Sequence, residues 1–418
     1  MSSISYDCIL KKVKGKILSA SEINEIINDI VNGRLSDVEL AAFVTAVKIH
    51  GLMNQEIVSL TLAEVSTGNI FDFGSDVYDK HSTGGVPGNK VSLIIVPIVA
   101  AAGLIIPKTS TRAITSPSGT ADSMETLAPV KFKSDEVKEM VKKNGACIIW
   151  GGHLETVPAD SLLIKIEKKL HLDPFGLMIP SILAKKMSMG VKKLVLDIPC
   201  GKGTKFKNAD EGRKFALFFK EISKKVKIET ECALTNAIQP IGHCVGPAIE
   251  AREALYLLYD YKKGPNSLIE KSTDLAGILL EMGGKAQQGT GQHMAKNILR
   301  SGKALEKMKK IIEIQEGNPN IKPEDIEVGP LEAEFFSAKS GYVTDIDNSI
   351  INKIAKTAGC PQEKSAGIEL FKKIGALVKE GDLIFKIYAK DNSKLEKATE
   401  LFNASSPVIL GGMIIERV

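Results

Sequence analysis

Between residues 69 and 333, short apolar runs alternate with glycine-containing loops and with stretches of helical periodicity. The runs expected to form strands are residues 77–79, 104–108, 147–150, 194–198 and 227–234. Strands that alternate with helices along a chain are typical of a parallel or mixed sheet covered by helices. The alternation therefore predicts an α/β domain.

The segment before residue 69 has helical periodicity, and it is expected to contain three consecutive helices. Ser19 with Glu22, and Ser36 with Glu39, have the spacing of capping boxes, in which a hydroxyl and a carboxylate accept free N–H groups at a helix start. Three glycines are expected to end the helices in the left-handed conformation: Gly33, Gly51 and Gly68. The segment predicts a small helical unit.

Two adjoining helical patterns, at residues 159–169 and 175–189, interrupt the alternation, and a segment inserted in this way can return to pack on the N-terminal helices. From residue 334 onward, short strands with Gly and Asp turns predict a C-terminal lobe, with strands expected around residues 341–347, 376–387 and 413–418 and a tight turn at residues 379–383. The predicted domains are a helical domain of residues 1–68 and 158–190, an α/β phosphate-binding domain of residues 69–157 and 191–333, and a C-terminal α/β lobe of residues 334–418. The fold class is thus a helical domain plus a mixed-sheet α/β domain with a C-terminal α+β lobe.

Length and composition limit the class of protein further. A chain of 418 residues is too long for one compact core and suits several domains. With 55 Lys and Arg against 50 Asp and Glu, the net charge of +5 provides no domain-wide basic surface for nucleic acid. The six cysteines are scattered without a Cys-x-x-Cys pair, which favours a reducing compartment over a zinc site or a disulfide framework. No apolar run is long enough for a membrane span, so we expect a cytoplasmic protein.

Two polar loops each follow a predicted strand and precede a predicted helix. Residues 110–120 combine hydroxyls, one guanidinium and a glycine, and residues 79–92 combine glycines with Lys80, Ser82, Thr83 and Ser92. Glycines let backbone N–H groups approach an anion closely, and a helix N-terminus adds its dipole. The alternatives are an ordinary polar turn for residues 110–120 and a capped glycine turn for residues 79–92. Together the loops predict an anion site.

The same residues carry a resemblance to a known family. Asp-Lys-His-Ser-Thr-Gly-Gly at residues 79–85 and Ser-Ile-Leu-Ala-Lys-Lys at residues 181–186 resemble the thymidine and pyrimidine-nucleoside phosphorylases, and the likeness runs over nearly the whole chain. Residues 111–122, Thr-Arg-Ala-Ile-Thr-Ser-Pro-Ser-Gly-Thr-Ala-Asp, are similar to the archaeal-type AMP phosphorylase branch rather than to the usual ending Thr-Gly-Gly-Thr-Leu-Asp. The resemblance implies a nucleoside phosphorylase/phosphoribosyltransferase-like fold, and phosphorolysis of nucleoside 5′-monophosphates to a base and ribose 1,5-bisphosphate.

The resemblance also implies the site residues. Inorganic phosphate would be held by Lys80, Ser82, Ser92, Ser110 and Thr120. The substrate would be bound by Gly85, Thr111, Arg112, Ala113, Ile114, Thr115, Ser116, Thr120, Ser181, Lys185 and Lys205. Asp173 would be the general acid that protonates the leaving base, and an apolar wall of Leu172, Pro174 and Phe175 would favour its protonated form. The other interpretation of Asp173 is a helix N-cap ahead of Pro174.

Three positions distinguish the AMP phosphorylase branch from the nucleoside phosphorylases of the family. Ile166 stands where the nucleoside enzymes have a pyrimidine-binding arginine, Asp173 matches the proton donor of the AMP phosphorylases, and Lys205 matches a substrate-binding lysine of that branch. We expect the Lys205 ammonium to meet the 5′-phosphate, and Arg112 to bind a phosphate through two N–H groups. Ser181 and Lys185 are four residues apart and share a helix face, whereas Lys186 is expected to be a solvated lysine.

The implied assembly is a homodimer through the N-terminal helices, and the implied partners are a nucleotide and inorganic phosphate, with no metal or organic cofactor. AMP phosphorylases carry an additional N-terminal domain, associated with higher-order assembly, that this sequence does not contain, so the resemblance leaves assembly beyond a dimer open. The nearest alternative function is a pyrimidine nucleoside phosphorylase, and a less favoured one is a catalytically silent nucleotide-binding protein. A phosphoribosyltransferase is disfavoured because the sequence has no evident acidic pair for magnesium and pyrophosphate.

Overall fold

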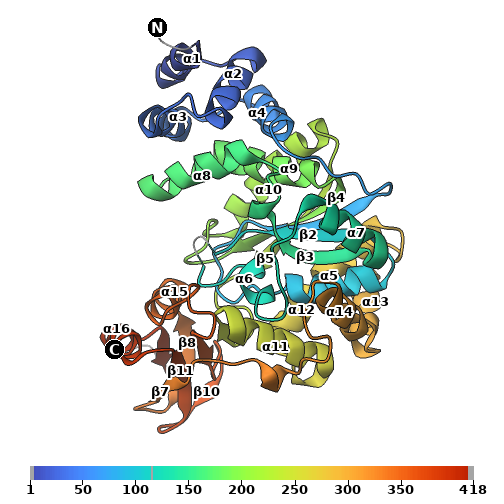
Figure 1. Cartoon of the computed structure of the whole chain (residues 1–418). Helices are drawn as coiled ribbons and strands as arrows, with labels where there is room; N and C mark the ends of the chain where they lie inside the picture. Colours follow the sequence, from blue (N-terminus) through green and yellow to red (C-terminus); the bar gives the residue numbers. More distant parts are fainter. Residues whose placement is uncertain (1–3, 114–115, 413–418) are drawn as a thin grey trace. The chain divides into compact units, whose positions relative to one another are not determined.

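The computed structural model describes residues 4–113 and 116–412, and the chain divides into two compact units (Figure 1). Unit 1 consists of Met1–His81, Gly151–Leu194 and Phe215–Glu231, and unit 2 of Ser82–Trp150, Val195–Lys214 and Cys232–Val418. One sheet has the order β1-β4-β5, formed by β1 (Val77–Ser82), β4 (Val191–Cys200) and β5 (Glu229–Asn236). The boundary between the units falls within each of these three strands and within α10 (Ala209–Lys225).

Unit 1 is largely helical. Its helices are α1 (Ile4–Val13), α2 (Ala20–Val31), α3 (Asp37–His50), α4 (Asn54–Ser66), α8 (Pro158–Leu170) and α9 (Phe175–Ser188). The described part of the first 68 residues therefore contains four helices, and the prediction of three was wrong. The additional helix, α1, lacks a capping-box pattern in the sequence, and it is stabilised by burying Cys8 and Ile9 against the other helices.

Both predicted capping boxes are confirmed. Ser19 Oγ accepts the N–H of Glu22 at 3.3 Å, while the Glu22 carboxylate accepts the N–H of Ser19 at 2.7 Å. Ser36 and Glu39 form the same pair of bonds before α3, at 3.4 and 2.7 Å. These reciprocal bonds satisfy two of the free N–H groups at each helix start, so they determine where α2 and α3 begin.

The separated segments of unit 1 share one hydrophobic core. Leu163 and Ile166 of α8 and Leu177 of α9 belong to the same cluster of buried side chains as Ile26 of α2 and Phe43 of α3. In Figure 1, α8 and α9 accordingly lie beside the blue N-terminal helices. The helical segment around residues 158–190 thus packs on the N-terminal helices, because each isolated amphipathic helix would leave its apolar stripe in water.

The three glycines predicted to end helices behave differently from one another. Gly33 has a φ of 65°, the positive value expected after a helix, whereas Gly51, the C-cap of α3, has a φ of 69° with a ψ of −176°, which is not the left-handed helical conformation. Gly68 does not have positive φ, and a Cβ there would lie 2.1 Å from the Thr156 carbonyl oxygen. The role predicted for Gly68 was wrong, because this glycine permits close approach of two backbone segments of unit 1.

Unit 2 contains the parallel pair β2 (Ile106–Ser110) and β3 (Ala146–Trp150) and the helices around it. These helices are α5 (Ser92–Ala101), α6 (Thr120–Met124), α7 (Ser134–Asn144), α11 (Pro247–Tyr259), α12 (Asn266–Met282), α13 (Gly291–Arg300) and α14 (Lys303–Ile314). Residues 92–100 of α5 are all buried, and α5 contacts both β2 and α6. An apolar helix of this kind is stable only inside a core, which explains why it lacks an exposed polar face.

The C-terminal part of unit 2 has its own hydrophobic cluster, to which residues of two antiparallel sheets and two helices contribute. One sheet has the order β10-β8-β12 and the other β6-β9-β11-β7. The strands are β6 (Cys244–Val245), β7 (Leu331–Phe336), β8 (Gly341–Ile346), β9 (Gly367–Leu370), β10 (Leu377–Val378), β11 (Leu383–Ala389) and β12 (Val408–Gly411), with helices α15 (Asn348–Thr357) and α16 (Asn392–Ala404). The turn at residues 379–383 does not join a hairpin, because β10 pairs with β8 whereas β11 pairs with β7 and β9. The strand predicted at residues 413–418 lies outside the described residues.

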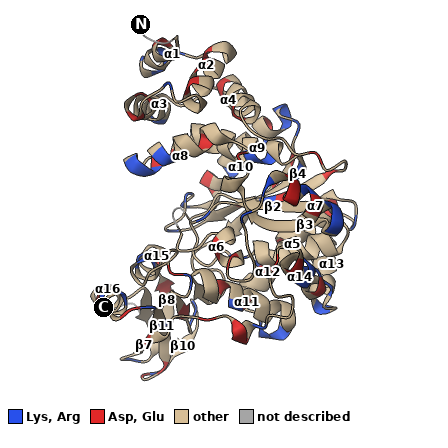
Figure 2. Ribbon diagram, in the orientation of Figure 1, with Lys and Arg blue, Asp and Glu red and all other residues tan. Residues whose placement is uncertain are grey.

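Figure 2 colours the basic and acidic residues, and both kinds occur in helices of each unit. Among the described residues, no helix is long and apolar enough to cross a lipid bilayer. The same residues include no group of three or more His, Cys, Asp or Glu side chains that could hold a metal ion.

Candidate active site

The first predicted loop connects the end of β1 to the start of α5. Ser82 is the last residue of β1 and Ser92 is the first residue of α5, and Ser92 is buried. Lys80 is 3% exposed, and its backbone N–H donates to Asp79 Oδ1 at 2.7 Å. Lys80 is a buried cation of unit 1 and the N-terminus of α5 belongs to unit 2; each feature by itself favours an anion.

Gly85 lies in a part of this loop where no side chain would fit. Its φ is 96°, and a Cβ at this position would lie 2.9 Å from Thr204 Cα and 3.3 Å from the Lys205 backbone nitrogen. The structure thus brings together Gly85 and Lys205, which are 120 positions apart in the sequence. Any larger residue would push the two segments apart.

The segment that carries Lys205 is a closed turn. The Gly201 N–H donates to the Phe206 carbonyl at 2.9 Å, and the Thr204 hydroxyl lies within 3.1 Å of the carbonyl oxygens of Pro199, Gly201 and Phe206. Cys200 and Phe206 also form an isolated β-bridge. These bonds fix the backbone on both sides of Lys205, which is half-buried.

The second predicted loop runs from the end of β2 at Ser110 to the start of α6 at Thr120, as the sequence indicated. The buried Asp122 carboxylate connects two parts of the loop. Its Oδ2 atom accepts the N–H of Ala113 at 2.7 Å and the N–H of Gly119 at 3.0 Å. Sequence reasoning overlooked this role of Asp122. Ser92, Ser110 and Thr120 stand at the ends of α5, β2 and α6, which contact one another within unit 2.

Two hydroxyls of the second loop donate to carbonyl groups of the same loop, whereas Ser118 Oγ lies 2.8 Å from Ser123 Oγ of α6. Ser110 Oγ donates to the Thr111 carbonyl at 3.0 Å, and Ser116 Oγ donates to the Ser118 carbonyl at 2.8 Å. Thr111 is exposed. The predicted substrate residues Ile114 and Thr115 lie outside the described residues.

Arg112 is engaged by carboxylates in this structure rather than left open for a phosphate. Its guanidinium donates to the two Glu125 oxygens at 2.5 and 2.6 Å and to Asp122 Oδ1 at 3.1 Å, and it lies 5.1 Å from the centre of the Trp150 ring. Lys364 pairs with the same two carboxylates at 2.8 and 3.0 Å. The hydrogen bonds from Arg112, followed by those from Lys364, lower the pKa of Glu125 to about 2. The predicted phosphate contact of Arg112 stays a prediction, and it would require exchange of Glu125 for the ligand.

Ser181 and Lys185 lie together in unit 1. Lys185 Nζ donates to Ser181 Oγ at 2.9 Å and lies 2.7 Å from Asp160 Oδ2 of α8. Glu64 of α4 is fully buried, and burial, followed by the nearby Asp160 charge, raises its pKa well above the usual value. Lys185 therefore lies within hydrogen-bonding distance of both the Ser181 hydroxyl and the Asp160 carboxylate.

Asp173 is exposed and precedes α9, which begins at Phe175 after the N-cap residue Pro174. The alternative interpretation of Asp173 as the N-cap was therefore wrong. Its backbone carbonyl accepts from Lys48 Nζ at 3.4 Å. Phe175 is 52% exposed and its ring centre lies 6.0 Å from that of Phe215, so an apolar wall does not enclose Asp173 in unit 1.

Two other expectations about this helical segment have clear outcomes. Lys186 is buried and pairs with the buried Asp79 carboxylate at 2.5 Å, so the prediction of a solvated lysine was wrong. The prediction failed because the partner of Lys186 comes from a distant segment of the chain. A buried ammonium must be offset by a buried anion, and Asp79 provides it. Ile166 is 2% exposed within the helical core, and the position of the family's pyrimidine-binding arginine is here a packing residue.

Several polar residues that support the first loop were not predicted. Lys90, fully buried, pairs with Glu253 at 2.5 Å and donates to the carbonyls of Ile241 and Cys244 at 3.1 and 2.8 Å. Asp197, also buried, lies in the middle of β4. The sequence did contain a signal for the role of Asp197, because it is an aspartate within the apolar run of residues 194–198. A buried charge is costly without partners, so polar partners could have been expected near it.

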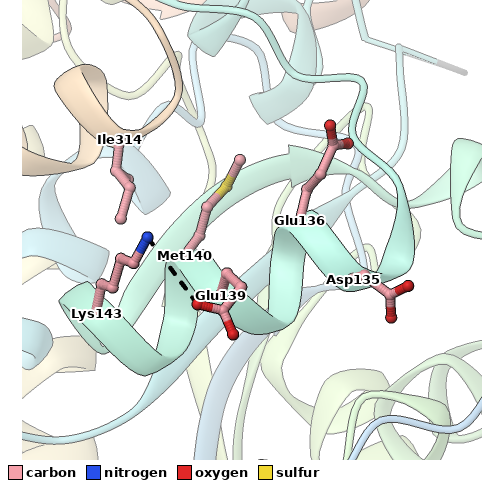
Figure 3. A pocket seen from close by; sticks show the side chains of 6 residues that line it. All are labelled: Asp135, Glu136, Glu139, Met140, Lys143 and Ile314. Carbon is pink, nitrogen blue, oxygen red and sulfur yellow. Dashed lines mark ion pairs between the residues drawn. The ribbon is translucent and has the colours of Figure 1, made fainter.

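A hollow of about 400 Å³ on unit 2 lies apart from these residues (Figure 3). It is lined by Asp135, Glu136, Glu139, Met140, Lys143 and Ile314, and Figure 3 shows that all but Ile314 come from α7. Lys143 Nζ lies 4.0 Å from Glu139 Oε2. Since none of the predicted site residues lines this hollow, we assign it no part in the site.

Known families match three consecutive segments of the chain. Residues 6–68 match the helical bundle domain and residues 74–305 the a/b domain of a glycosyl transferase family. Residues 342–408 match the pyrimidine nucleoside phosphorylase C-terminal domain. A solved structure of anthranilate phosphoribosyltransferase from Thermus thermophilus has a TM-score of 0.62 at 18% identity, and the match covers 74% of this chain and 100% of that one. The predicted fold class is thereby confirmed.

Curated relatives match the whole chain. The AMP phosphorylase of Thermococcus kodakarensis is 53% identical over 100% of this chain and 82% of its own length. The AMP phosphorylases of Methanosarcina acetivorans and Pyrococcus furiosus are 48% and 49% identical, over 100% and 99% of this chain and 83% and 82% of their own lengths. The chain therefore belongs to the glycosyl transferase family that carries these helical-bundle and a/b domains and, within it, to the group of the AMP phosphorylases.

Proposed function

We propose that this protein is a pentosyltransferase that phosphorolyses nucleoside 5′-monophosphates to the free base and ribose 1,5-bisphosphate, with AMP as the first candidate substrate and CMP and UMP as further ones. A phosphate oxygen attacks C1′ of the ribose, and the glycosidic C–N bond breaks with its electron pair moving to the base. The Asp173 carboxyl group gives its proton to that base nitrogen. Inorganic phosphate is the co-substrate, and no metal or organic cofactor takes part in the proposed reaction.

The chemistry explains why the reaction needs both residues that hold inorganic phosphate and a residue that protonates the leaving base. Positive charge builds on the ribose and negative charge on the departing base, so the anionic nucleophile must be positioned and the leaving group neutralised. Lys80, Ser82 and Ser92 of the first loop, with Ser110 and Thr120 of the second, are proposed to hold inorganic phosphate. Ser181 and Lys185 are proposed to contact the base or sugar.

One observation carries the preference for a nucleotide. The close approach of Gly85 to Lys205 places a lysine-bearing turn against the glycine-rich loop of the proposed phosphate site. A substrate with a 5′-phosphate brings a second anion, and a second cation would bind it through charge-assisted hydrogen bonds. The buried Ile166 supports the same preference, because it leaves that position without the arginine that holds the pyrimidine in the nucleoside enzymes.

The direct test is an assay of base release from AMP, CMP, UMP, thymidine and uridine, with and without inorganic phosphate. We expect phosphate-dependent release from at least one monophosphate, together with formation of ribose 1,5-bisphosphate. Efficient turnover of thymidine or uridine without turnover of any monophosphate would instead establish the alternative, a pyrimidine nucleoside phosphorylase. Binding of nucleotides without base release would establish a catalytically silent nucleotide-binding protein.

Replacement of Lys205 by alanine tests its proposed contact with the 5′-phosphate. Loss of a charge-assisted hydrogen bond should raise the KM for the monophosphate by roughly 10- to 100-fold, with a smaller effect on the KM of any nucleoside that is turned over. Lys202 is the matched control, because it lies on the same turn but is exposed and lies 3.4 Å from Asp345 and 3.7 Å from Asp347. Lys202→Ala should leave both KM values nearly unchanged. Equal effects of Lys205→Ala on nucleotide and nucleoside would show that Lys205 does not bind the 5′-phosphate.

The homodimer through the N-terminal helices and the cytoplasmic location stay predictions. Light scattering of the purified protein measures the first directly, and an apparent mass of one chain would contradict it.

A further inference from the structure

A chain of hydrogen bonds connects the first loop to the interior of unit 2. Asn89 Nδ2 donates to Ser82 Oγ at 3.1 Å and to Asp197 Oδ2 at 3.2 Å. Asp197 is completely buried on β4, and its backbone carbonyl accepts the N–H of Thr83 at 3.0 Å. One aspartate therefore holds the loop through both its side chain and its backbone.

The Asp197 carboxylate determines which way the Asn89 amide points. An ionised carboxylate only accepts hydrogen bonds, so the amide must present its NH₂ group to Asp197 and not its carbonyl oxygen. The second hydrogen of the same NH₂ group then points at Ser82 Oγ. Asn89 Oδ1, in agreement, is buried with no hydrogen-bond partner among residues 4–113 and 116–412.

This arrangement leaves the Ser82 hydroxyl only one role. Its oxygen accepts from Asn89 Nδ2 at 3.1 Å and from the Gly84 N–H at 3.3 Å. A hydroxyl has two acceptor positions and one proton, so with both acceptor positions occupied its proton must be donated to a third group. The group that such a hydroxyl best recognises is a pure acceptor, such as a phosphate oxygen.

The negative charge of Asp197 is offset inside unit 2. Lys271 Nζ of α12 lies 3.1 Å from Asp197 Oδ2, with both residues buried, and Thr235 Oγ1 donates to Asp197 Oδ1 at 2.6 Å. Without Lys271, a buried carboxylate behind the loop would repel an incoming anion. The ion pair therefore lets Asp197 order the loop without opposing phosphate.

We propose that Asn89 and Asp197 are positioning residues for the phosphate nucleophile, which act by presenting the Ser82 hydroxyl as a hydrogen-bond donor, with Lys271 as the counter-ion of Asp197. The proposal rests on the proposed function, because it takes Ser82 to contact inorganic phosphate. It assigns a role to three residues for which the family resemblance implied none.

A double-mutant cycle on the full-length enzyme tests the proposal. Asn89→Ala should raise the KM for inorganic phosphate roughly tenfold and leave the KM for the monophosphate within about twofold. In a Ser82→Ala background the same substitution should add less than about twofold, because Asn89 acts through Ser82. In a Ser92→Ala background it should keep its full effect, since Ser92 is proposed to contact phosphate independently of Asn89.

Two further variants test the direction of the hydrogen bond. Asn89→Asp is close to isosteric but accepts from the Ser82 hydroxyl, so it should raise the phosphate KM more than Asn89→Ala does. Asp197→Asn should also raise it, because an amide at that position no longer forces the Asn89 NH₂ group toward Ser82. A smaller effect of Asn89→Asp than of Asn89→Ala would overturn the proposal, whatever the behaviour of Asp197→Asn.

The outcomes separate this proposal from the proposed function. If Ser82→Ala leaves the phosphate KM unchanged, or if the wild-type enzyme releases no base with phosphate, the proposed function or its phosphate site is wrong. If Ser82→Ala raises the KM for inorganic phosphate but the effect of Asn89→Ala is fully additive to that of Ser82→Ala, the proposed phosphate site is supported and the positioning role of Asn89 is wrong. The proposal is supported if the effect of Asn89→Ala on the phosphate KM is additive with that of Ser92→Ala and not additive with that of Ser82→Ala.

Discussion

Replacement of Asp173 by asparagine is expected to lower kcat for nucleoside monophosphates by about 10²- to 10⁴-fold, the usual contribution of a positioned general acid. Asparagine keeps the size and much of the polarity of aspartate, but it has no proton to give to the departing base. Nucleotide affinity measured in the absence of phosphate should therefore stay within about twofold of the wild type. The measurements are steady-state phosphorolysis and equilibrium binding of the same nucleotide.

The leaving group distinguishes acid catalysis from a structural role. An N7-methylated purine nucleotide releases a neutral base without protonation, so the loss caused by Asp173→Asn should be much smaller with that substrate. Asp37→Asn is the matched control, because Asp37 also lies in unit 1, is exposed and pairs with Lys169 at 2.7 Å. It should keep wild-type kcat. An unchanged kcat in Asp173→Asn would remove Asp173 from the mechanism.

Replacement of Lys12 by methionine is expected to cost about 3–5 kcal/mol of stability, as is typical when one partner of a buried ion pair is removed. Lys12 Nζ lies 2.9 and 3.2 Å from the two Glu56 oxygens, and both residues are buried. The Glu56 carboxylate also accepts the N–H groups of Leu18 at 3.0 Å and Met53 at 2.7 Å, so it cannot turn toward water without breaking the start of α4. Methionine would leave this charge buried and uncompensated.

Lys11 is the matched control for this prediction. It lies on the same helix and pairs with Glu22 at 2.8 Å, but both side chains are partly exposed. Lys11→Met should therefore cost only about 0–1 kcal/mol. The measurement is the urea midpoint of unfolding, followed by circular dichroism. Addition of Glu56→Gln to Lys12→Met should recover part of the loss, and equal costs of Lys11→Met and Lys12→Met would contradict the argument.

Local sequence patterns predicted much of the fold. The two capping boxes located the starts of α2 and α3, because their hydrogen bonds join residues only three positions apart. Apolar runs located β1 to β5 to within a few residues. The predicted end of β2 and start of α6 likewise follow from residues adjacent in the sequence, so the second loop was recognisable before its structure was known.

The errors concern residues whose surroundings come from distant segments. Lys186 appeared to be a solvated lysine because its partner, Asp79, is 107 positions away. Gly68 appeared to be a helix end, whereas the backbone that approaches it is near Thr156. α1 was missed because its sequence has no capping-box pattern, whereas Cys8 and Ile9 are buried against other helices, which only the tertiary structure shows.

The residue types and their order in the sequence alone determined the α/β class, the two polar loops and, through the motifs at residues 79–85 and 181–186, the family. Only the tertiary structure decided what the polar groups do: Arg112 meets Glu125, Lys185 meets Asp160, and Asn89 connects Ser82 to Asp197. The physical reason is that a loop or helix start needs only neighbouring residues, whereas a buried charge or hydroxyl is defined by the partners that packing brings to it.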